Sequence, residues 1–228
     1  MFFPERITLI KKTDRVLEVG PGSTPHPRAD VLLEKEYDDE AEFRLQRGNT
    51  DPLHTSKKIV IYKGGRFPFA DKEFDYVICS HVLEHVDDPP ALLKEVFRVG
   101  KKGYIEFPTS YYDFVYNIPV HKVLLMYKKG RIFWLPKSET AFEAVRPFQD
   151  FLFATLMKEH FGMVNSLREY FVQGFEWEDV IAIEKAKAIE DVCFDYSQIE
   201  NIPLCRPEPV SLGLKAEIRK KLKRLFSD

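Results

Sequence analysis

Val16-Leu17-Glu18-Val19-Gly20-Pro21-Gly22 is the stretch that decides the fold: an apolar run ends in an acid and then breaks into Gly-x-Gly. Glycine adopts positive φ and has no Cβ, so two glycines at this spacing let the chain turn sharply while a ligand lies against the backbone. The stretch therefore predicts a buried β-strand followed by a binding loop. Taken alone, it also fits a plain tight turn after a strand.

Composition narrows the class of protein. A chain of 228 residues with 44% hydrophobic content has room for one α/β domain with an embellishment. Its 34 basic and 36 acidic residues exclude a global field that recruits nucleic acid. The cysteines, Cys79, Cys193 and Cys205, are odd in number and form no Cys-x-x-Cys pair, which favours a reducing compartment. With no signal-peptide pattern and no run near the ~18 apolar residues of a membrane span, we expect a cytoplasmic protein.

Short β-rich runs alternate with polar connections in the first half of the chain, which is typical of a parallel sheet. Asp87 or Asp88 is a suitable N-cap for a helix that has Pro89 in its first turn and ends at Gly100. This helix joins the last two predicted strands into a βαβ unit. The predicted strands are Asp14–Val19, Asp30–Glu34, Lys58–Tyr62, Phe74–Cys79 and Gly103–Phe107.

After Pro108 the chain becomes rich in aromatic residues. We predict a hairpin over Val123–Leu135 that turns at Lys128-Lys129-Gly130, and then a helix over Phe148–Phe161. Two further strands, Leu167–Val172 and Trp177–Ile183, are predicted to complete the main sheet.

A second motif adds specificity to the glycine loop. Phe67-Pro68-Phe69-Ala70-Asp71 leads into Phe74–Val86, which contains Leu83-Glu84-His85. Together with residues 16–22, this resembles class I S-adenosylmethionine-dependent methyltransferases of the Leu-Glu-His type. The resemblance covers about residues 12 to 110. It implies an enzyme that transfers a methyl group from S-adenosylmethionine. No motif after Pro108 identifies the acceptor, and we expect a small molecule or a glycan, for example a cell-envelope saccharide.

The resemblance also implies an architecture. We expect an α/β fold with a doubly wound, mostly parallel, seven-stranded Rossmann-like sheet over residues 1–200. A substrate or lid insertion is expected at about 108–160, after the fifth strand. Residues 201–228 are predicted to form a C-terminal tail.

In an open α/β sheet the ligand lies at the carboxyl ends of the strands, where the strand order reverses. The resemblance assigns the amino-acid end of the cofactor to the first loop, both ribose hydroxyls to the acid that ends the second strand, and the adenine to residues 64–67. Residues 80 and 81 close the other side. The predicted cofactor-binding residues are Glu18, Gly20, Pro21, Gly22, Glu34, Gly64, Gly65, Arg66, Phe67, Ser80 and His81.

Three features depart from common patterns. Pro25 stands where a dinucleotide fingerprint has a small residue, which disfavours NAD. Only ten residues, Pro21 to Asp30, link the first two strands. Ten extended residues reach roughly 33 Å, enough to return along a strand of ~20 Å, so we predict a parallel crossover without a helix. Lys63 stands where the family often has an acid facing adenine.

Methyl transfer asks the protein to align the acceptor, the methyl carbon and the sulfur, and to exclude water. A hydroxyl acceptor also benefits from a base, and His81 and His121 are the candidates for catalytic residues. A carboxylate or thiolate acceptor needs none. The aromatic residues of the insertion are predicted to form a lid, core packing or a homodimer contact; they are Tyr111, Tyr112, Phe114 and Tyr116.

Two other functions are compatible with these motifs. His81-Val82-Leu83-Glu84-His85 matches the inverted zinc-peptidase pattern, in which two histidines one helical turn apart bind zinc. That pattern needs a continuous helix, whereas here a predicted strand ends at Cys79 and Pro89-Pro90 follow closely, so we predict no metal. The other alternative is a non-catalytic module that binds S-adenosylmethionine.

The tail carries an apolar stripe at helical spacing, formed by Leu214, Ile218, Leu222 and Leu225. Lys215 to Arg224 holds six basic residues and one acid, which predicts a basic amphipathic helix. Such a helix docks on its own domain or on a partner subunit, lies weakly on an anionic membrane, or contacts RNA phosphates. The RNA signal is the weakest of the three because no aromatic residues are interleaved to stack bases.

Overall fold

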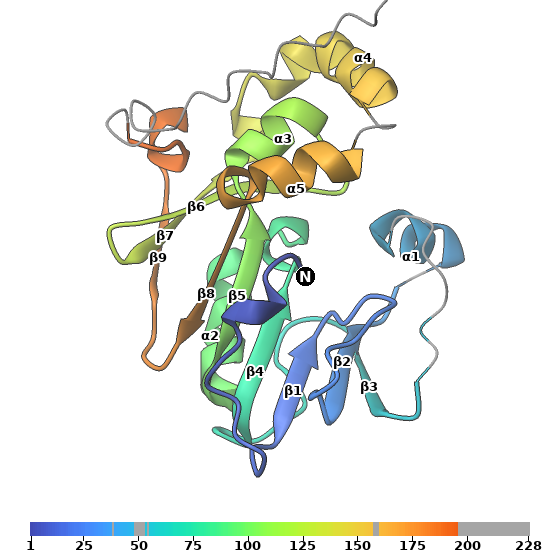
Figure 1. The fold of residues 1–228 in the computed structure, drawn as a ribbon, viewed down its shortest axis with the longest axis vertical. Coiled ribbons are helices and arrows are strands. Elements are labelled where there is room, and N and C mark those ends of the chain that lie inside the picture. Colours follow the sequence, from blue (N-terminus) through green and yellow to red (C-terminus); the bar gives the residue numbers. More distant parts are fainter. Residues whose placement is uncertain (38, 48–52, 54, 157–159, 196–228) are drawn as a thin grey trace, which may run out of the picture. The chain divides into compact units, whose positions relative to one another are not determined.

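A computed structural model describes residues 1–195 except 38, 48–52, 54 and 157–159. Its central sheet has six strands in the order β3-β2-β1-β4-β5-β8 (Figure 1). The first five are parallel, as predicted, and β8 runs antiparallel to β5. The described residues thus form six strands of this sheet and not the predicted seven, and the sheet is mixed. The strands are β1 Val16–Val19, β2 Val31–Lys35, β3 Lys58–Tyr62, β4 Phe74–Ser80, β5 Gly100–Pro108 and β8 Val172–Trp177.

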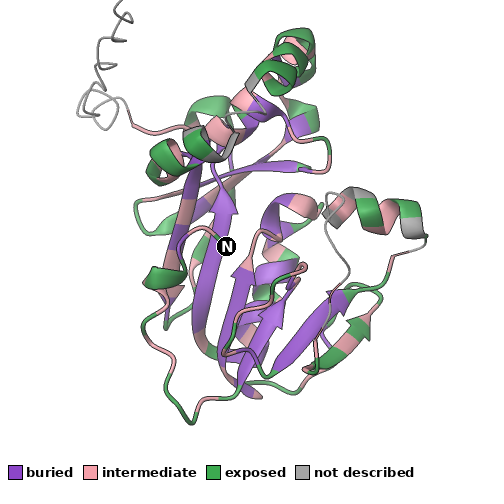
Figure 2. Cartoon of the chain, turned by 45° about the vertical axis from the view of Figure 1, so that its right-hand side comes forward, coloured by how far each residue is buried: buried purple, intermediate pink, exposed green. Residues whose placement is uncertain are grey.

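Different elements cover the two faces of the sheet. On one face, Leu93 and Val96 of α2 (Pro89–Val99) belong to the same buried cluster as Leu17 and Val77 of the strands. The other face carries a second cluster, Val16, Tyr76, Ile78 and Tyr104, against which Ile7, Leu9 and Ile10 pack. The strand order is the one expected for a doubly wound sheet. On this face, however, the N-terminal segment covers the strands, where a doubly wound fold usually has helices. Figure 2 shows the inner strands between these layers as largely buried and the edge strand β3 as mostly exposed.

Local signals set several boundaries. The Asp88 side chain accepts from the N–H of Ala91 (3.0 Å), so Asp88 caps α2 as predicted. Residues 20–30 return from β1 to β2 without a helix, which confirms the extended crossover. At its end, the Asp30 carboxylate accepts from the N–H of Val16 (2.8 Å) and ties the crossover to the start of β1. Helix α1 (Glu40–Arg47) lies between β2 and β3.

The chain between β5 and β8 forms a separate layer. It contains α3 (Ser110–Tyr116), the hairpin β6 (Val123–Lys128) and β7 (Arg131–Pro136), α4 (Arg146–Leu156) and α5 (His160–Phe171). The hairpin confirms its prediction and turns at Lys129-Gly130, both with positive φ. Short 3-10 helices span Pro4–Arg6, Leu83–His85, Lys137–Glu139, Phe142–Val145 and Ile189–Val192.

Three predictions in the second half of the chain were wrong in detail. The helix predicted over Phe148–Phe161 is α4 together with the start of α5. The strand predicted over Leu167–Val172 is mostly the end of α5, because Val164, Leu167 and Phe171 form one helical stripe that packs on Phe3 and Tyr116.

The predicted strand Trp177–Ile183 is divided between two sheets. Strand β8 ends at Trp177, and the bends at residues 178 and 179 lead to β9 (Ala182–Lys185). Strand β9 pairs parallel with β7 in a three-stranded sheet of order β6-β7-β9. It therefore does not complete the main sheet.

The C-terminal tail predicted over residues 201–228, including its amphipathic helix, lies outside the described residues. Within the described part of the chain, every helix is too short or too polar to cross a membrane.

Candidate active site

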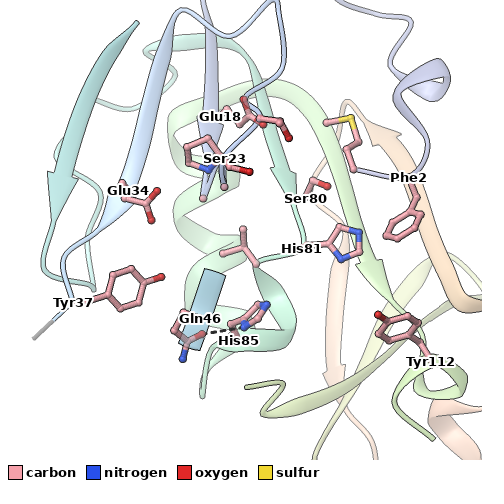
Figure 3. A pocket seen from close by; sticks show the side chains of 16 residues that line it. Phe2, Glu18, Ser23, Glu34, Tyr37, Gln46, Ser80, His81, His85 and Tyr112 are labelled. Atoms are coloured by element: carbon pink, nitrogen blue, oxygen red, sulfur yellow. Dashed lines mark hydrogen bonds between the residues drawn. The ribbon is translucent and has the colours of Figure 1, made fainter. Parts of the chain in front are cut away.

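A cavity of about 540 Å³ lies at the carboxyl ends of β1, β2 and β4, where the strand order reverses (Figure 3). Its volume is within the range of small-molecule and cofactor sites. Its lining comes from the first loop, the ends of β2 and β4, helix α1, the N-terminal segment and helix α3. The lining residues are Met1, Phe2, Glu18, Gly20, Pro21, Gly22, Ser23, Thr24, Glu34, Tyr37, Gln46, Ser80, His81, Val82, His85 and Tyr112.

The two glycines of the first loop have different reasons to be glycine. Both adopt φ +61°, a conformation that side chains disfavour. A Cβ on Gly20 would lie 2.7 Å from Cγ2 of Val82, so this glycine permits close packing of the loop that follows β4. A Cβ on Gly22 would meet nothing within 4 Å. Gly22 therefore leaves open space beside the backbone, as a ligand-binding loop requires.

Two buried carboxyl groups face this cavity. Glu18 is 5% exposed and accepts from the N–H of His26 (2.7 Å). Burial raises the pKa of Glu18 to about 7, although the His26 hydrogen bond opposes the rise. Glu34, at the end of β2, is 7% exposed. Figure 3 shows the two side chains on different sides of one open space, so the cavity can bind a cation at one side and hydroxyl donors at another.

His81 lies between two buried carboxylates. Its Nδ1 is 3.1 Å from Oε1 of Glu84, and its Nε2 is 3.1 Å from Oε1 of Glu106. Burial alone would lower the pKa of His81, but the neighbouring carboxylates of Glu106 and Glu84 outweigh it and raise this pKa to about 9. His81 is therefore an imidazolium at neutral pH. The expectation that it acts as a general base is corrected, because it has no free lone pair to accept a proton.

Glu106 joins the N-terminal segment to the cavity. This fully buried carboxylate accepts from the N–H groups of Phe2 (2.7 Å) and Phe3 (2.9 Å), and from the hydroxyls of Ser80 (2.8 Å) and Tyr104 (2.7 Å). The segment is thereby held beside the carboxyl end of β4, near the N-terminus marked in Figure 1. The centroid of the Phe2 ring lies 5.3 Å from that of the His81 ring, and Phe2 closes one side of the cavity.

The structure brings most of the predicted cofactor residues together, but leaves the segment predicted to border adenine out of the cavity lining. Gly64, Gly65 and Arg66 are exposed. Phe67 is 1% exposed in the core, and its N–H donates to Glu95 (2.8 Å). The predicted residues that do line the cavity are Glu18, Gly20, Pro21, Gly22, Glu34, Ser80 and His81.

His121 is placed beside the cavity but does not line it. Its Nδ1 lies 2.8 Å from Oδ2 of Asp113, whose other oxygen is 3.2 Å from Nζ of Lys137. His121 lines a second cavity of about 400 Å³, to which Lys122 and Lys137 also contribute. The rings of His121 and His85 pack edge to face with centroids 5.0 Å apart, and His85 lines the first cavity. These two histidines therefore lie where the two cavities approach each other.

Several lining residues were not predicted. Tyr37 and Gln46 follow β2, a region for which the sequence shows no motif. Tyr112 belongs to the aromatic group predicted as a lid or as core. His85, which the sequence presented only within the Leu-Glu-His and zinc-peptidase patterns, contacts Oε1 of Gln46 through Nδ1 (3.1 Å). For the N-terminal segment the one available signal is Glu106, an acid inside an apolar predicted strand.

The arrangement needed by the zinc-peptidase alternative is not formed. Strand β4 ends at Ser80, His81 has φ +56°, and the 3-10 helix Leu83–His85 has three residues. His81 and His85 are thus not on successive turns of one α-helix. The Nδ1 atom of His81 points to Glu84, which therefore does not face a water bound between two histidines.

Comparison with known proteins bears on the same region. Residues 38–107 match the family model described as a methyltransferase domain. An uncharacterized methyltransferase of Schizosaccharomyces pombe is 35% identical over 107 residues, which are 41% of this chain and 38% of that protein. An uncharacterized protein of Methanocaldococcus jannaschii is 41% identical over 46 residues, 20% of this chain and 22% of its own. This chain thus spans well under half the length of either relative.

Among solved structures, a methyltransferase dependent on S-adenosylmethionine from Thermotoga maritima is similar at 22% identity and a TM-score of 0.32, covering 46% of this chain and 48% of its own. One from Mesorhizobium loti is similar at 16% identity and a TM-score of 0.32, covering 53% and 56%.

Proposed function

We propose that this chain, which carries a class I S-adenosylmethionine-dependent methyltransferase domain, binds S-adenosylmethionine in the 540 Å³ cavity and transfers its methyl group to a small-molecule or glycan acceptor. One observation carries the proposal: the buried carboxyl groups of Glu18 and Glu34 and the open backbone at Gly22 face one cavity at the switch point of the sheet. This is where an open α/β sheet binds its ligand.

The donors and acceptors of the cavity fit the cofactor. Glu18 supplies a carboxylate for the ammonium of its amino-acid end, and the loop at Gly22 lets that end lie against the backbone. Glu34 accepts from the ribose hydroxyls. Tyr37 lines both the main cavity and a small adjoining one of about 80 Å³ with Tyr62, so we assign the adenine to Tyr37 in place of Phe67.

The bound cofactor supplies an electrophilic methyl group on a sulfonium that already carries its leaving group. The chain has to position the acceptor and exclude water. Phe2 and Tyr112 provide apolar walls beside His81, on the side of the cavity opposite Glu34 (Figure 3). An acceptor that enters past His121 would meet charged side chains of both signs, because Lys122 pairs with Asp87 at 2.7 Å and Lys137 pairs with Asp113 at 3.2 Å. Such a polar lining suits a hydroxyl-rich acceptor such as a cell-envelope saccharide.

Calorimetry tests the cofactor assignment. We expect S-adenosylhomocysteine to bind with one site per chain and NAD to give no comparable heat. Heat with NAD and none with S-adenosylhomocysteine would overturn the proposal. Turnover is then followed as S-adenosylhomocysteine release with pooled metabolites, sugar nucleotides, lipid-linked glycans and RNA. Cofactor binding without transfer to any of these pools would instead identify a non-catalytic binding module.

A further inference from the structure

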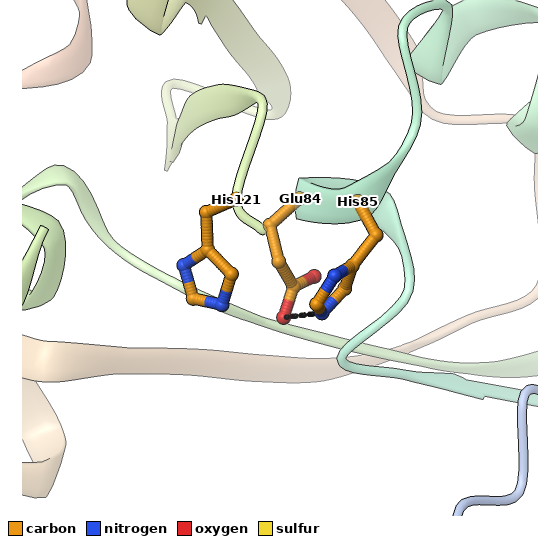
Figure 4. A group of neighbouring side chains, drawn as sticks. All are labelled: Glu84, His85 and His121. Atoms are coloured by element: carbon orange, nitrogen blue, oxygen red, sulfur yellow. Dashed lines mark ion pairs between the residues drawn. The ribbon is translucent and has the colours of Figure 1, made fainter. Parts of the chain in front are cut away.

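Glu84, His85 and His121 form a side-chain cluster that the proposed cofactor site does not use. One potential ligand atom from each residue lies within 4.8 Å of the others (Figure 4). Nε2 of His85 is 3.9 Å from Oε1 of Glu84. The residues come from two segments, the 3-10 helix after β4 and the loop between α3 and β6. The N–H of Lys122 donates to the carbonyl of Glu84 (2.7 Å) and joins these segments.

Each imidazole of the cluster is held through its other nitrogen. Nδ1 of His85 lies 3.1 Å from Oε1 of Gln46, and Nδ1 of His121 lies 2.8 Å from Oδ2 of Asp113. Both partners are acceptors, so in the neutral imidazole each Nδ1 carries the proton and each Nε2 offers its lone pair to the cluster. Metal-binding histidines are oriented in this way, with a carboxylate or carbonyl oxygen behind the ring.

The carboxylate of Glu84 is buried and only partly hydrogen-bonded. Its side chain is 1% exposed, and Oε2 is a buried oxygen without a hydrogen-bond partner among the described residues. Oε1 is held by Nδ1 of His81 at 3.1 Å. A buried carboxylate oxygen that lacks a donor is costly unless something else compensates it. A cation between Glu84 and the two imidazoles would do so.

We propose that Glu84, His85 and His121 bind one divalent cation of the zinc class. Two imidazole nitrogens and one carboxylate oxygen suit Zn²⁺ and its neighbours better than Mg²⁺ or Ca²⁺, which prefer oxygen ligands. Zinc bonds of about 2.0–2.2 Å place ligand atoms roughly 3.3 Å apart. Closing the present cluster therefore needs side-chain movements of about 1 Å.

Three protein ligands leave a coordination position open, as in catalytic metal sites. His85 lines the first cavity and His121 the second, so the cation lies where the cofactor cavity and the proposed acceptor entrance meet. Its role rests on the proposed function: it binds a hydroxyl oxygen of the acceptor and lowers the pKa of that hydroxyl. The proton is then released to solvent, and the acceptor oxygen bonds to the methyl carbon as the carbon–sulfur bond breaks.

The site differs from the zinc-peptidase pattern. His81 is no ligand here but orients Glu84, and His121 from a distant segment replaces it. This ligand set does not follow from the sequence motif, because its third member lies 36 positions after His85.

Metal content of the full chain tests the proposal without any substrate. Bound metal is removed from the protein with a chelator, the protein is dialysed against Zn²⁺, and its zinc content is measured by elemental mass spectrometry. In a second experiment, Co²⁺ replaces zinc, and its absorption spectrum reports the ligand set. We expect one equivalent of zinc per chain. Glu84→Gln, His85→Ala and His121→Ala should each bind at least tenfold more weakly. His26→Ala is the control because it removes an imidazole from the loop between β1 and β2, and it should bind as the wild type does.

Asp113→Asn probes the site without removing a ligand and should weaken zinc binding 10- to 100-fold. It decides the question if His121→Ala fails to fold, which circular dichroism reports. Less than a tenth of an equivalent in the wild type, or full zinc in folded His121→Ala, would overturn the site. S-adenosylhomocysteine binding is measured in parallel. Its absence would refute the proposed function and leave the metal result standing.

Discussion

Replacing Glu18 with glutamine should change how the stability of this protein depends on pH. Glu18 is 5% exposed, and burial raises its pKa from 4.5 to about 7. Glutamine has nearly the same shape and can still accept from the N–H of His26, but it does not titrate. The difference between the two proteins therefore isolates the cost of ionising this one buried carboxyl group.

The sign follows from proton binding. Between pH 4.5 and about 7, the folded protein holds a proton on Glu18 that the unfolded chain has lost. Stability then falls as pH rises, because the native state binds more protons than the unfolded state. From these two pKa values, the wild type loses about 2 to 3 kcal/mol of unfolding free energy between pH 5 and pH 8 that Glu18→Gln does not lose.

Urea unfolding of both proteins at intervals from pH 5 to pH 8 measures this difference directly, because the other titrating groups cancel. Parallel pH profiles would refute the reasoning and mean that Glu18 ionises in the folded state as it does in water. A second readout uses the ligand. The ammonium of S-adenosylhomocysteine favours the carboxylate, so binding near pH 6 should release close to one proton from the wild type and none from Glu18→Gln, as seen by calorimetry in buffers of different ionisation enthalpy.

Three further predictions concern other parts of the chain. Glu34→Ala should weaken S-adenosylhomocysteine binding by about 1–3 kcal/mol in calorimetry, because an acceptor for buried hydroxyls is lost, whereas the exposed Glu36→Ala should not. Glu106→Ala should lower the free energy of unfolding in urea by about 3–5 kcal/mol, whereas the exposed Glu184→Ala should lower it by at most about 1 kcal/mol. Equal losses would mean that the hydrogen bonds of Glu106 do not hold the N-terminal segment. The full-length protein should bind anionic liposomes weakly and in a salt-sensitive way, and truncation after Leu212 should abolish this binding but keep cofactor binding. If the full-length protein does not bind such liposomes at low salt, membrane contact is excluded.

The parts of the fold predicted correctly are those coded by neighbouring residues. The first five strands follow from apolar runs between polar breaks, helix α2 from the cap at Asp88, and the hairpin from Lys129-Gly130. The extended crossover follows from counting residues between two strands. Each of these depends on local propensity, on turn chemistry or on chain reach, and all three can be read within a window of about a dozen residues.

The predictions that failed depend on tertiary contacts. Leu167 to Phe171 have strand-like composition, but their helix is selected by packing on Phe3, more than 160 positions earlier. Phe67 was expected to contact the ligand, but its side chain is buried in the core and does not line the cavity. The N-terminal segment lines the cavity because Phe2 donates to Glu106, a contact across 104 positions that no local pattern reports.

The histidines show most clearly why residue type and spacing are not enough to assign a role. His81 was the natural candidate for a base because it follows β4 at the switch point, but carboxylates 3.1 Å from both ring nitrogens make it a cation. His85 and His121 each have an acceptor at Nδ1, which in the neutral imidazole leaves the lone pair at Nε2. A lone pair can bind a metal or accept a proton, and a cation can do neither. The chemistry of His85 and His121 therefore depends on the acceptor that each Nδ1 contacts. Helix α1 supplies it for His85 through Gln46, and helix α3 supplies it for His121 through Asp113.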